Sequence, residues 1–221
     1  MHLPITRSYP RLSGLAEDHK REYTGRMVDH EISVAQEPGW LTGQLLLAMP
    51  SLRDARFAQS VIFICAHNKD GAMGLTLNRL LRKPKFEDLM QQLGVEPYPP
   101  QRTLPISSGG PVDEHRGFVL HSADWSGHGS LNIDGTHVLS ANLEVLQAVA
   151  SGAGPAHARL LLGYAGWGSG QLEEEIQHNS WMTAPPDDEI LYGTAYQTKW
   201  QRAFANLKID PSRLSGDAGR A

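Results

Sequence analysis

The only cysteine of the chain, Cys65, stands two residues before His67, and the two form the first candidate for chemistry. On a β-strand such side chains share a face, with Cα atoms about 6.5–7 Å apart. A thiolate beside an imidazolium would act as a nucleophile or a redox sensor. Cys65 also ends the apolar run 61–64, and burial raises the pKa of a thiol and makes it inert. We favour a structural thiol and keep a thiol- or histidine-dependent enzyme, built on Cys65, His67 and Asn78, as the alternative.

Four cations, Arg79, Arg82, Lys83 and Lys85, fall within seven residues. A solvated loop explains such a run, and a patch that binds phosphate or another acid is the alternative. Direct DNA binding through these cations is a further hypothesis, but no helix-turn-helix or RNA-binding aromatic pattern accompanies them. The net charge of −4 also provides no global field toward nucleic acid. We therefore do not expect nucleic acid as a partner.

Two glycine-rich segments are able to bring the backbone close to a ligand. The segment 163–170 looks like a phosphate cradle before a helix, but it matches neither GxGxxG nor GxxxxGK[ST]. The acidic residues 173–175 would also repel an anion there. The pair Gly109-Gly110 does not form a GxSxG nucleophile elbow. We interpret both segments as tight turns, and Trp167 as a packing residue.

His121, Asp124 and His128 offer groups that bind metals, in the spacing H-x-x-D-x-x-x-H. Ten histidines in 221 residues produce such spacings by chance. Neither an HExxH motif nor a cysteine ligand accompanies them. We predict no metal site and no cofactor.

The elements that position these residues follow from periodicity and from turn residues. Strands are expected at 41–49, 60–66, 72–78, 103–107, 117–121, 138–139 and 160–164, with a hairpin turn at 68–71. Helices are expected from Phe86 to Gly94, from an N-cap at Ser140 to Ala150, and over 171–178 and 195–207. Strands and helices interleave without strict β-α-β alternation, which favours the α+β class.

Composition bounds the remaining possibilities. A chain of 221 residues fits one large domain with an appendage, and a single cysteine excludes an intrachain disulfide. Residues 1–39 mix both charges without apolar periodicity, so we predict a flexible N-terminal extension before a folded domain at 40–221. The longest apolar runs are far shorter than the roughly 20 residues that cross a bilayer. We expect a cytoplasmic protein without membrane contact.

The motifs of the folded part resemble those of the YqgE/AlgH family of bacterial proteins. The matching segments run in family order over essentially all of 40–221, and include Leu41-Thr42-Gly43, Ser60-Val61-Ile62, Gly71-Ala72-Met73-Gly74-Leu75, Gly109-Gly110-Pro111-Val112, Gly163-Tyr164-Ala165-Gly166-Trp167 and Ser180-Trp181. Three departures are Ala66 where many relatives carry Glu, Leu80 where Pro is frequent, and Arg220 where His is common. The first weakens the idea that a carboxylate beside the thiol is required.

The resemblance implies one α+β domain, whose mixed, branched sheet curls into a partly closed barrel with helices outside. It implies no biochemical activity, since none is established for the family; the label of transcriptional regulator comes from a proposed role in alginate production. We therefore favour a non-enzymatic regulatory or binding protein over an enzyme, with a protein or small ligand as its partner. The candidate pocket or partner surface comprises Asn78, Gly109, Gly110, His121, Trp167, Gln171 and Glu175.

Overall fold

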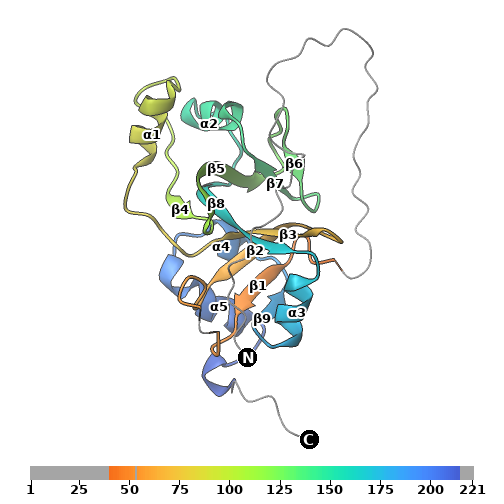
Figure 1. Ribbon diagram of the computed structural model, residues 1–221. Coiled ribbons are helices and arrows are strands. Elements are labelled where there is room, and N and C mark those ends of the chain that lie inside the picture. Colours follow the sequence, from red (N-terminus) through yellow and green to blue (C-terminus); the bar gives the residue numbers. More distant parts are fainter. Residues whose placement is uncertain (1–39, 53, 215–221) are drawn as a thin grey trace, which may run out of the picture. The chain divides into compact units, whose positions relative to one another are not determined.

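Nine β-strands form one continuous sheet in the computed structural model, which describes residues 40–52 and 54–214 (Figure 1). The strands are β1 Leu45–Ala48, β2 Val61–Asn68, β3 Gly71–Thr76, β4 Ile106–Ser108, β5 Val112–Ser122, β6 Leu131–Asn132, β7 His137–Ser140, β8 Ala158–Gly168 and β9 Trp181–Ala184. The flexible extension predicted at 1–39 lies outside the described residues.

Strand β8 is the branch point of the sheet. Eight strands follow the order β6-β7-β5-β8-β3-β2-β1-β9, and β4 pairs with β8 beside this path. The β8 segment 158–162 pairs antiparallel with β5, and its segment 165–168 pairs antiparallel with β3. The β4–β8 pairing is parallel, so the sheet is mixed. The sheet curls into a half-barrel, and the predicted α+β fold with a mixed, branched sheet and flanking helices is confirmed.

Helices in the described ranges cover the sheet on both faces. They are α1 Phe86–Leu93, α2 Leu143–Ala150, α3 Gln171–Gln177, α4 Asp188–Tyr192 and α5 Lys199–Asn206, with short 3-10 turns η1 Tyr196–Thr198 and η2 Pro211–Arg213. Gly94 ends α1 in the left-handed conformation, as its position predicted. The N-cap predicted for α2 is wrong. Asn142 accepts the Val145 N–H, while Ser140 belongs to β7.

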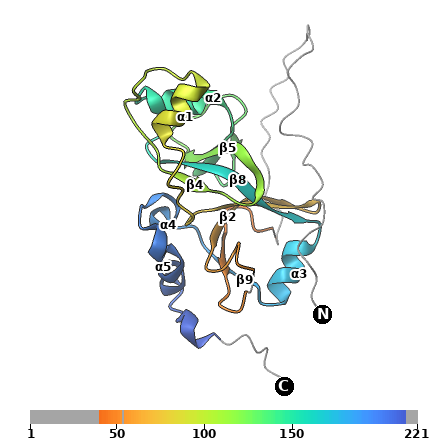
Figure 2. The ribbon, with the colours of Figure 1, turned by 60° about the vertical axis from the view of Figure 1, so that its left-hand side comes forward.

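Three apolar clusters hold these layers together. On one face of β2, Phe63 and Cys65 pack against residues of α4 and α5, including Ile190 and Phe204. On the opposite face of β2, Ile62 and Ile64 lie in a cluster with residues of α3 (Figure 2). The third cluster joins α1 and α2 to β4, β5 and β8. Coverage on both faces explains why β2 reads as a continuous apolar run.

The segment 163–170 is not the tight turn that its glycines predicted. Strand β8 continues through it to Gly168, and only 169–170 turn into α3. Gly166 and Gly168 lie opposite Met73 and Gly71 of β3, so cross-strand pairing overrides the weak strand propensity of glycine. Short β6, β9 and α4 were not predicted, because two to five residues carry too little periodicity.

Within residues 40–52 and 54–214, none of the helices combines the length and the apolar character that a bilayer crossing requires.

Candidate ligand-binding site

The expected Cys65–His67 pair does not form, because a β-bulge separates the two side chains. The β2–β3 register shifts between Ile64 and Ala66, which places one extra residue in β2. Cys65 therefore stays in the cluster beneath α4 and α5, and His67 pairs with Ala72 on the face toward α3. The expectation of a shared face is wrong. Burial also raises the pKa of the Cys65 thiol well above its usual range, with a further contribution from the charge of Asp134.

The His67 side chain lies between the segment before β1 and helix α3. Its Nδ1 accepts the Leu41 N–H at 3.0 Å, which leaves the hydrogen on Nε2 to donate to Glu173 at 2.9 Å. Its backbone N–H donates to the Thr42 hydroxyl at 3.0 Å. The imidazole therefore ties a loop to a helix.

Trp167, Gln171 and Glu175 of the candidate surface do come together, in a network that faces inward. Oε2 of Glu175 accepts the indole N–H of Trp167 at 2.9 Å and that of Trp181 at 2.7 Å. Oε1 accepts the Gln171 amide at 2.9 Å, and the Gln171 carbonyl oxygen accepts the Gly168 N–H. The two indoles meet edge to face. This network joins α3 to β8 and β9.

Gly109 and Gly110 bring two backbone segments into contact. A Cβ on Gly109 would lie 2.2 Å from the Gly163 oxygen, and one on Gly110 would lie 2.1 Å from the carbonyl carbon of Tyr164. Only glycine permits such an approach, and Gly110 also has φ +154°. The pair therefore packs against β8.

His121 is fully buried in β5, away from these residues. Its ring nitrogens lie 2.9 Å from the Ser122 carbonyl oxygen and 2.9 Å from the Ser140 hydroxyl. Burial lowers the pKa of His121, which keeps the ring neutral. Asp124 instead bonds to Ser122 and to the Ala156 N–H. The described part of the chain contains no cluster of three His, Cys, Asp or Glu side chains placed to hold a metal.

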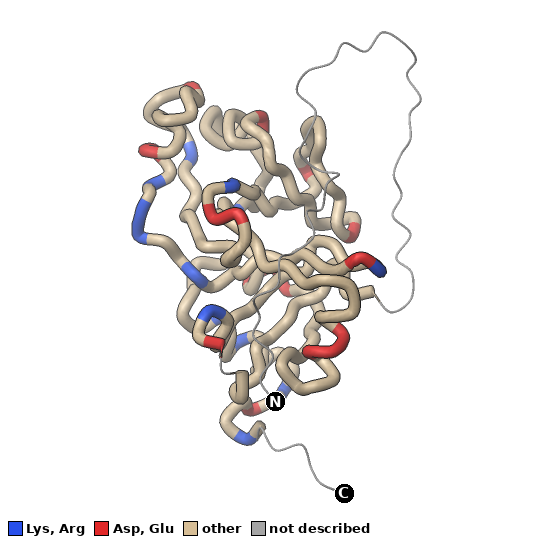
Figure 3. The backbone as a smooth tube through the Cα atoms, viewed as in Figure 1, with Lys and Arg blue, Asp and Glu red and all other residues tan. Residues whose placement is uncertain are grey.

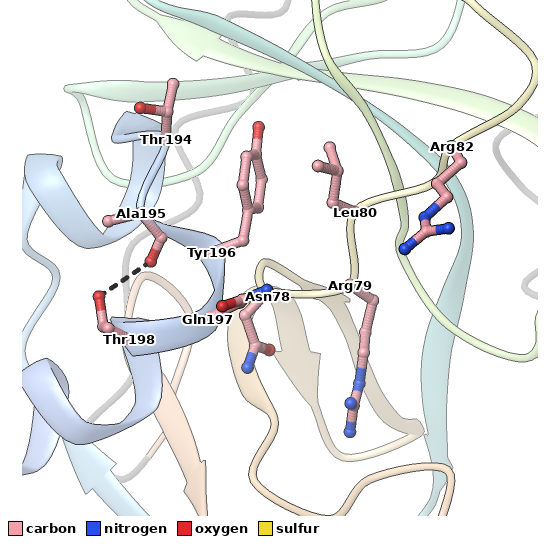
Figure 4. Close-up of a pocket in the computed structure, with 9 residues that line it drawn as sticks. All are labelled: Asn78, Arg79, Leu80, Arg82, Thr194, Ala195, Tyr196, Gln197 and Thr198. Atoms are coloured by element: carbon pink, nitrogen blue, oxygen red, sulfur yellow. Dashed lines mark hydrogen bonds between the residues drawn. The ribbon is translucent and has the colours of Figure 1, made fainter.

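A cavity of about 670 Å³ opens between the segment after β3 and the turn before α5 (Figure 4). We call it the loop–helix cavity. Its lining residues are Asn78, Arg79, Leu80, Arg82, Thr194, Ala195, Tyr196, Gln197 and Thr198. Of the candidate surface, Asn78 alone lies here. The run 79–85 follows β3 in the chain (Figure 3). Two of the four cations in this run, Arg79 and Arg82, line the cavity.

Hydrogen bonds to the main chain fix one wall of the cavity. The Asn78 carbonyl oxygen accepts the Val61 N–H at 3.1 Å, and its amide donates to the Gln59 oxygen at 2.8 Å. The Arg79 guanidinium donates to the Ala58 oxygen. In Figure 4 the Arg79 side chain points away from Thr194, whereas the exposed Arg82 extends from its loop toward the cavity.

Two buried cations support the opposite wall. Arg159 of β8 and Lys199 of α5 are each 1% exposed, and both lie against the ring of Tyr196. Their charged atoms, Arg159 Cζ and Lys199 Nζ, lie 4.7 Å and 5.7 Å from the ring centre. Arg159 donates to the Leu77 and Gly193 oxygens. Burial, and after it the positive charge of Arg159, lower the pKa of Lys199 to about 7. The Lys199 ammonium donates to the Glu189 and Ile190 carbonyl oxygens.

None of the residues that line this cavity is acidic, and within the described ranges Arg79, Arg82, Arg159 and Lys199 form no ion pair. Glu189 and Asp187 act on Lys199 through their charge, and Glu189 also pairs with Arg202 at 3.1 Å. Tyr196 Oη and Arg159 Nε are buried beside the cavity, and the Tyr196 hydroxyl interacts with the Arg159 guanidinium.

Comparison with known proteins places the whole fold in one family. The family model described as AlgH-like matches residues 45–212. The chain belongs to the AlgH-like family. The recognition made from its motifs is therefore confirmed.

AlgH-like relatives cover nearly the same part of the chain. A UPF0301 protein of Gluconobacter oxydans is 50% identical over 183 residues, which are 82% of this chain and 98% of that protein. A UPF0301 protein of Rhodospirillum rubrum is 46% identical over 183 residues, which are 83% of this chain and 95% of that protein.

Solved AlgH-like structures share the fold. The solution structure of the AlgH protein from Pseudomonas aeruginosa matches with a TM-score of 0.69 at 39% identity, over 84% of this chain and 98% of that one. A crystal structure of a Corynebacterium diphtheriae protein matches with a TM-score of 0.61 at 23% identity, over 77% of this chain and 88% of that one, and supports the fold alone.

Sequence reasoning missed the buried half of the candidate site, Arg159 and Lys199. Lys199 lies on the stripe of α5 that also carries Trp200, Ala203 and Phe204, so a cation on an apolar stripe was the signal. Arg159 begins the apolar run of β8, and a charge at that place was the second signal. Buried cations of this kind require partners, and main-chain carbonyl oxygens of Leu77, Gly193, Glu189 and Ile190 supply them here.

Proposed function

We propose that this AlgH-like domain is a non-enzymatic binding protein that holds a small molecule in the loop–helix cavity. The observation that carries the proposal is the composition of the lining: guanidinium, hydroxyl and amide groups beside apolar side chains, without Cys, His, Asp or Glu. Such a lining orients a ligand through hydrogen bonds, while it offers neither the general base nor the activated nucleophile of a hydrolase or transferase.

The groups that sequence analysis considered for catalysis support this proposal, because each is engaged elsewhere. The thiol of Cys65 lies in the core with a raised pKa. The ring of His67 bonds to Leu41 and Glu173, and that of His121 bonds to Ser122 and Ser140. A thiol–histidine enzyme would need Cys65 and His67 on one face of β2, and the bulge keeps them apart.

The DNA-binding hypothesis finds less support than ligand binding. Of the four cations in the run 79–85, Arg79 already donates to the Ala58 oxygen, and Arg82 belongs to the cavity wall. Binding to a phosphate backbone needs cations that are free along one surface. The regulatory role suggested by the family label, and a cytoplasmic location, belong to the same proposal, because a regulator can act by sensing its ligand.

Equilibrium dialysis of the full chain against a mixture of acidic, basic and neutral metabolites tests the proposal. We expect the wild-type protein to retain at least one compound and to return it chemically unchanged. Ala195→Trp fills the cavity and abolishes retention, whereas Ala205→Trp, on an exposed position of α5 outside the cavity, preserves it. Conversion of the retained compound, or equal retention by both variants, would contradict the proposal.

A further inference from the structure

The charge around the loop–helix cavity defines the chemistry of its ligand. We infer that the cavity binds a phosphate ester that carries an aromatic or apolar group, an inference that rests on the proposed function. The phosphate would lie near Arg82 and the Thr194 hydroxyl, and the apolar group near Leu80 and Tyr196.

Positive charge in a lining without acidic residues is the first step of the inference. Arg79 and Arg82 line the cavity, and Arg159 and Lys199 lie behind Tyr196. Two like charges at 1% exposure cost free energy, because burial removes their hydration and they repel one another. Main-chain carbonyl oxygens and the charges of Glu189 and Asp187 offset part of this cost. A dianion in the cavity would offset a further part. A neutral ligand would leave the cost unchanged.

Hydroxyl donors in the lining are the second step. Thr194 lies in the exposed turn that lines the cavity, and its hydroxyl supplies a donor for a terminal phosphate oxygen. The Thr198 hydroxyl already donates to the Ala195 oxygen at 3.2 Å. The Tyr196 hydroxyl is buried beside Arg159, so Tyr196 contributes its ring to the lining.

The direction of helix α5 is the third step. Its eight residues follow directly on the cavity-lining turn, so the positive end of its dipole lies beside the cavity. Helices α1, α2, α3 and α4 each carry acidic residues in the first turn, whereas η1 and α5 carry none. An anion would therefore meet the dipole without competition from a carboxylate in the first turn of α5.

The size and the apolar wall of the cavity exclude a bare inorganic ion as its best ligand. A volume of about 670 Å³ is in the usual range for small-molecule sites and far exceeds one phosphate. Leu80 is 49% exposed although it is a large apolar residue, and it lies beside Ala195 and Tyr196 in the lining. An aromatic or apolar group on the ester would cover this surface.

Calorimetric titration of the full chain with phenyl phosphate tests the inference. Inorganic phosphate and benzyl alcohol serve as probes of each half of the ligand alone. We expect phenyl phosphate to bind more tightly than either probe, because both the charge and the ring contribute.

Arg82→Ala should weaken phenyl phosphate binding roughly tenfold or more, because it removes a charged donor. Lys83→Ala removes the same charge from the next residue, which does not line the cavity, and should change binding less than about twofold.

Three results would overturn the inference. If benzyl alcohol binds as tightly as phenyl phosphate and Ala195→Trp abolishes both, the cavity binds neutral molecules, and the proposed function survives without its anionic ligand. If Arg82→Ala and Lys83→Ala weaken phenyl phosphate equally, the loop attracts anions without a site. If a duplex oligonucleotide binds with steep salt dependence and both variants weaken it equally, the run 79–85 binds nucleic acid instead. If the proposed function itself is wrong, the equilibrium dialysis retains no compound, and this result is independent of the titration with phenyl phosphate.

Discussion

Single residues decide whether this domain has reactive groups, and the contact expected between Cys65 and His67 from their spacing does not form. Cys65 was expected to be buried, and the structure places it in the core. Its separation from His67 depends on a bulge, which is set by the pairing of β2 with β3 and leaves no mark in the local sequence. The apolar run before Cys65 therefore predicted its burial correctly, but strand register decided which side chains meet.

The buried cation Lys199 leads to a prediction on pH dependence. Its pKa falls from 10.5 to about 7 in the folded protein, through burial first and then through the charge of Arg159. Between pH 7 and pH 10 the unfolded chain holds the proton more strongly, so the free energy of unfolding rises with pH over this window. Well below pH 7 Lys199 is protonated in both the folded and the unfolded protein, so burial of its charge lowers the free energy of unfolding by its full amount.

Urea unfolding of wild type and Lys199→Met at pH 7 and at pH 10 measures this contribution. The difference in free energy of unfolding between the two proteins should shift by on the order of 3 kcal/mol in favour of the wild type at pH 10. Comparison with the variant cancels the titration of other groups, among them the acidic neighbours Glu189 and Asp187. Parallel pH profiles of the two proteins would contradict a neutral Lys199 above pH 7.

At the scale of elements, the sequence predicted the buried strands and the long helices, and it failed where tertiary contacts override local preference. The stripe of α5 and the glycine end of α1 follow from the sequence alone. Strand β8 follows only at 160–164, because its continuation to Gly168 runs through glycines that the pairing with β3 stabilises. Arg159 and Lys199 each stood out as a cation in an apolar run, but their meeting at Tyr196 depends on long-range packing. The residues of the buried half were therefore visible in the sequence, and their contact was not.

The inward network of Glu175 predicts how α3 attaches to the sheet. Glu175→Ala would leave the indole N–H groups of Trp167 and Trp181 unpaired in a buried place. An unsatisfied buried donor costs about 1–3 kcal/mol, so we expect a loss of roughly 2–4 kcal/mol in the free energy of unfolding. Urea unfolding measures the loss.

Glu174→Ala is the matched control for this helix. Glu174 is exposed one residue away, and its side chain takes no part in the Trp–Glu175 bonds, so its removal should change stability by no more than about 0.5 kcal/mol. Glu175→Gln keeps one acceptor oxygen, so its free energy of unfolding should lie between those of Glu174→Ala and Glu175→Ala. Equal stability of Glu174→Ala and Glu175→Ala would show that the network contributes nothing.

At the scale of the whole molecule, the three apolar clusters consist of residues from Leu41 onward in the part of the chain that the structure describes. The AlgH-like family model likewise begins at residue 45. Residues 1–39 were predicted as a flexible extension, because their mixed charges cannot bury enough apolar surface to offset the entropy of ordering. We therefore expect a chain that starts at residue 40 to melt within about 2 °C of the full chain and to bind phenyl phosphate equally well.

A chain that starts at residue 48 is the control. It loses Leu45–Leu47 of β1, which are at most 1% exposed between β2 and β9, and should fail to fold. Calorimetric melting of the three chains would contradict the predicted boundary if removal of residues 1–39 lowered the melting temperature as much as the loss of β1.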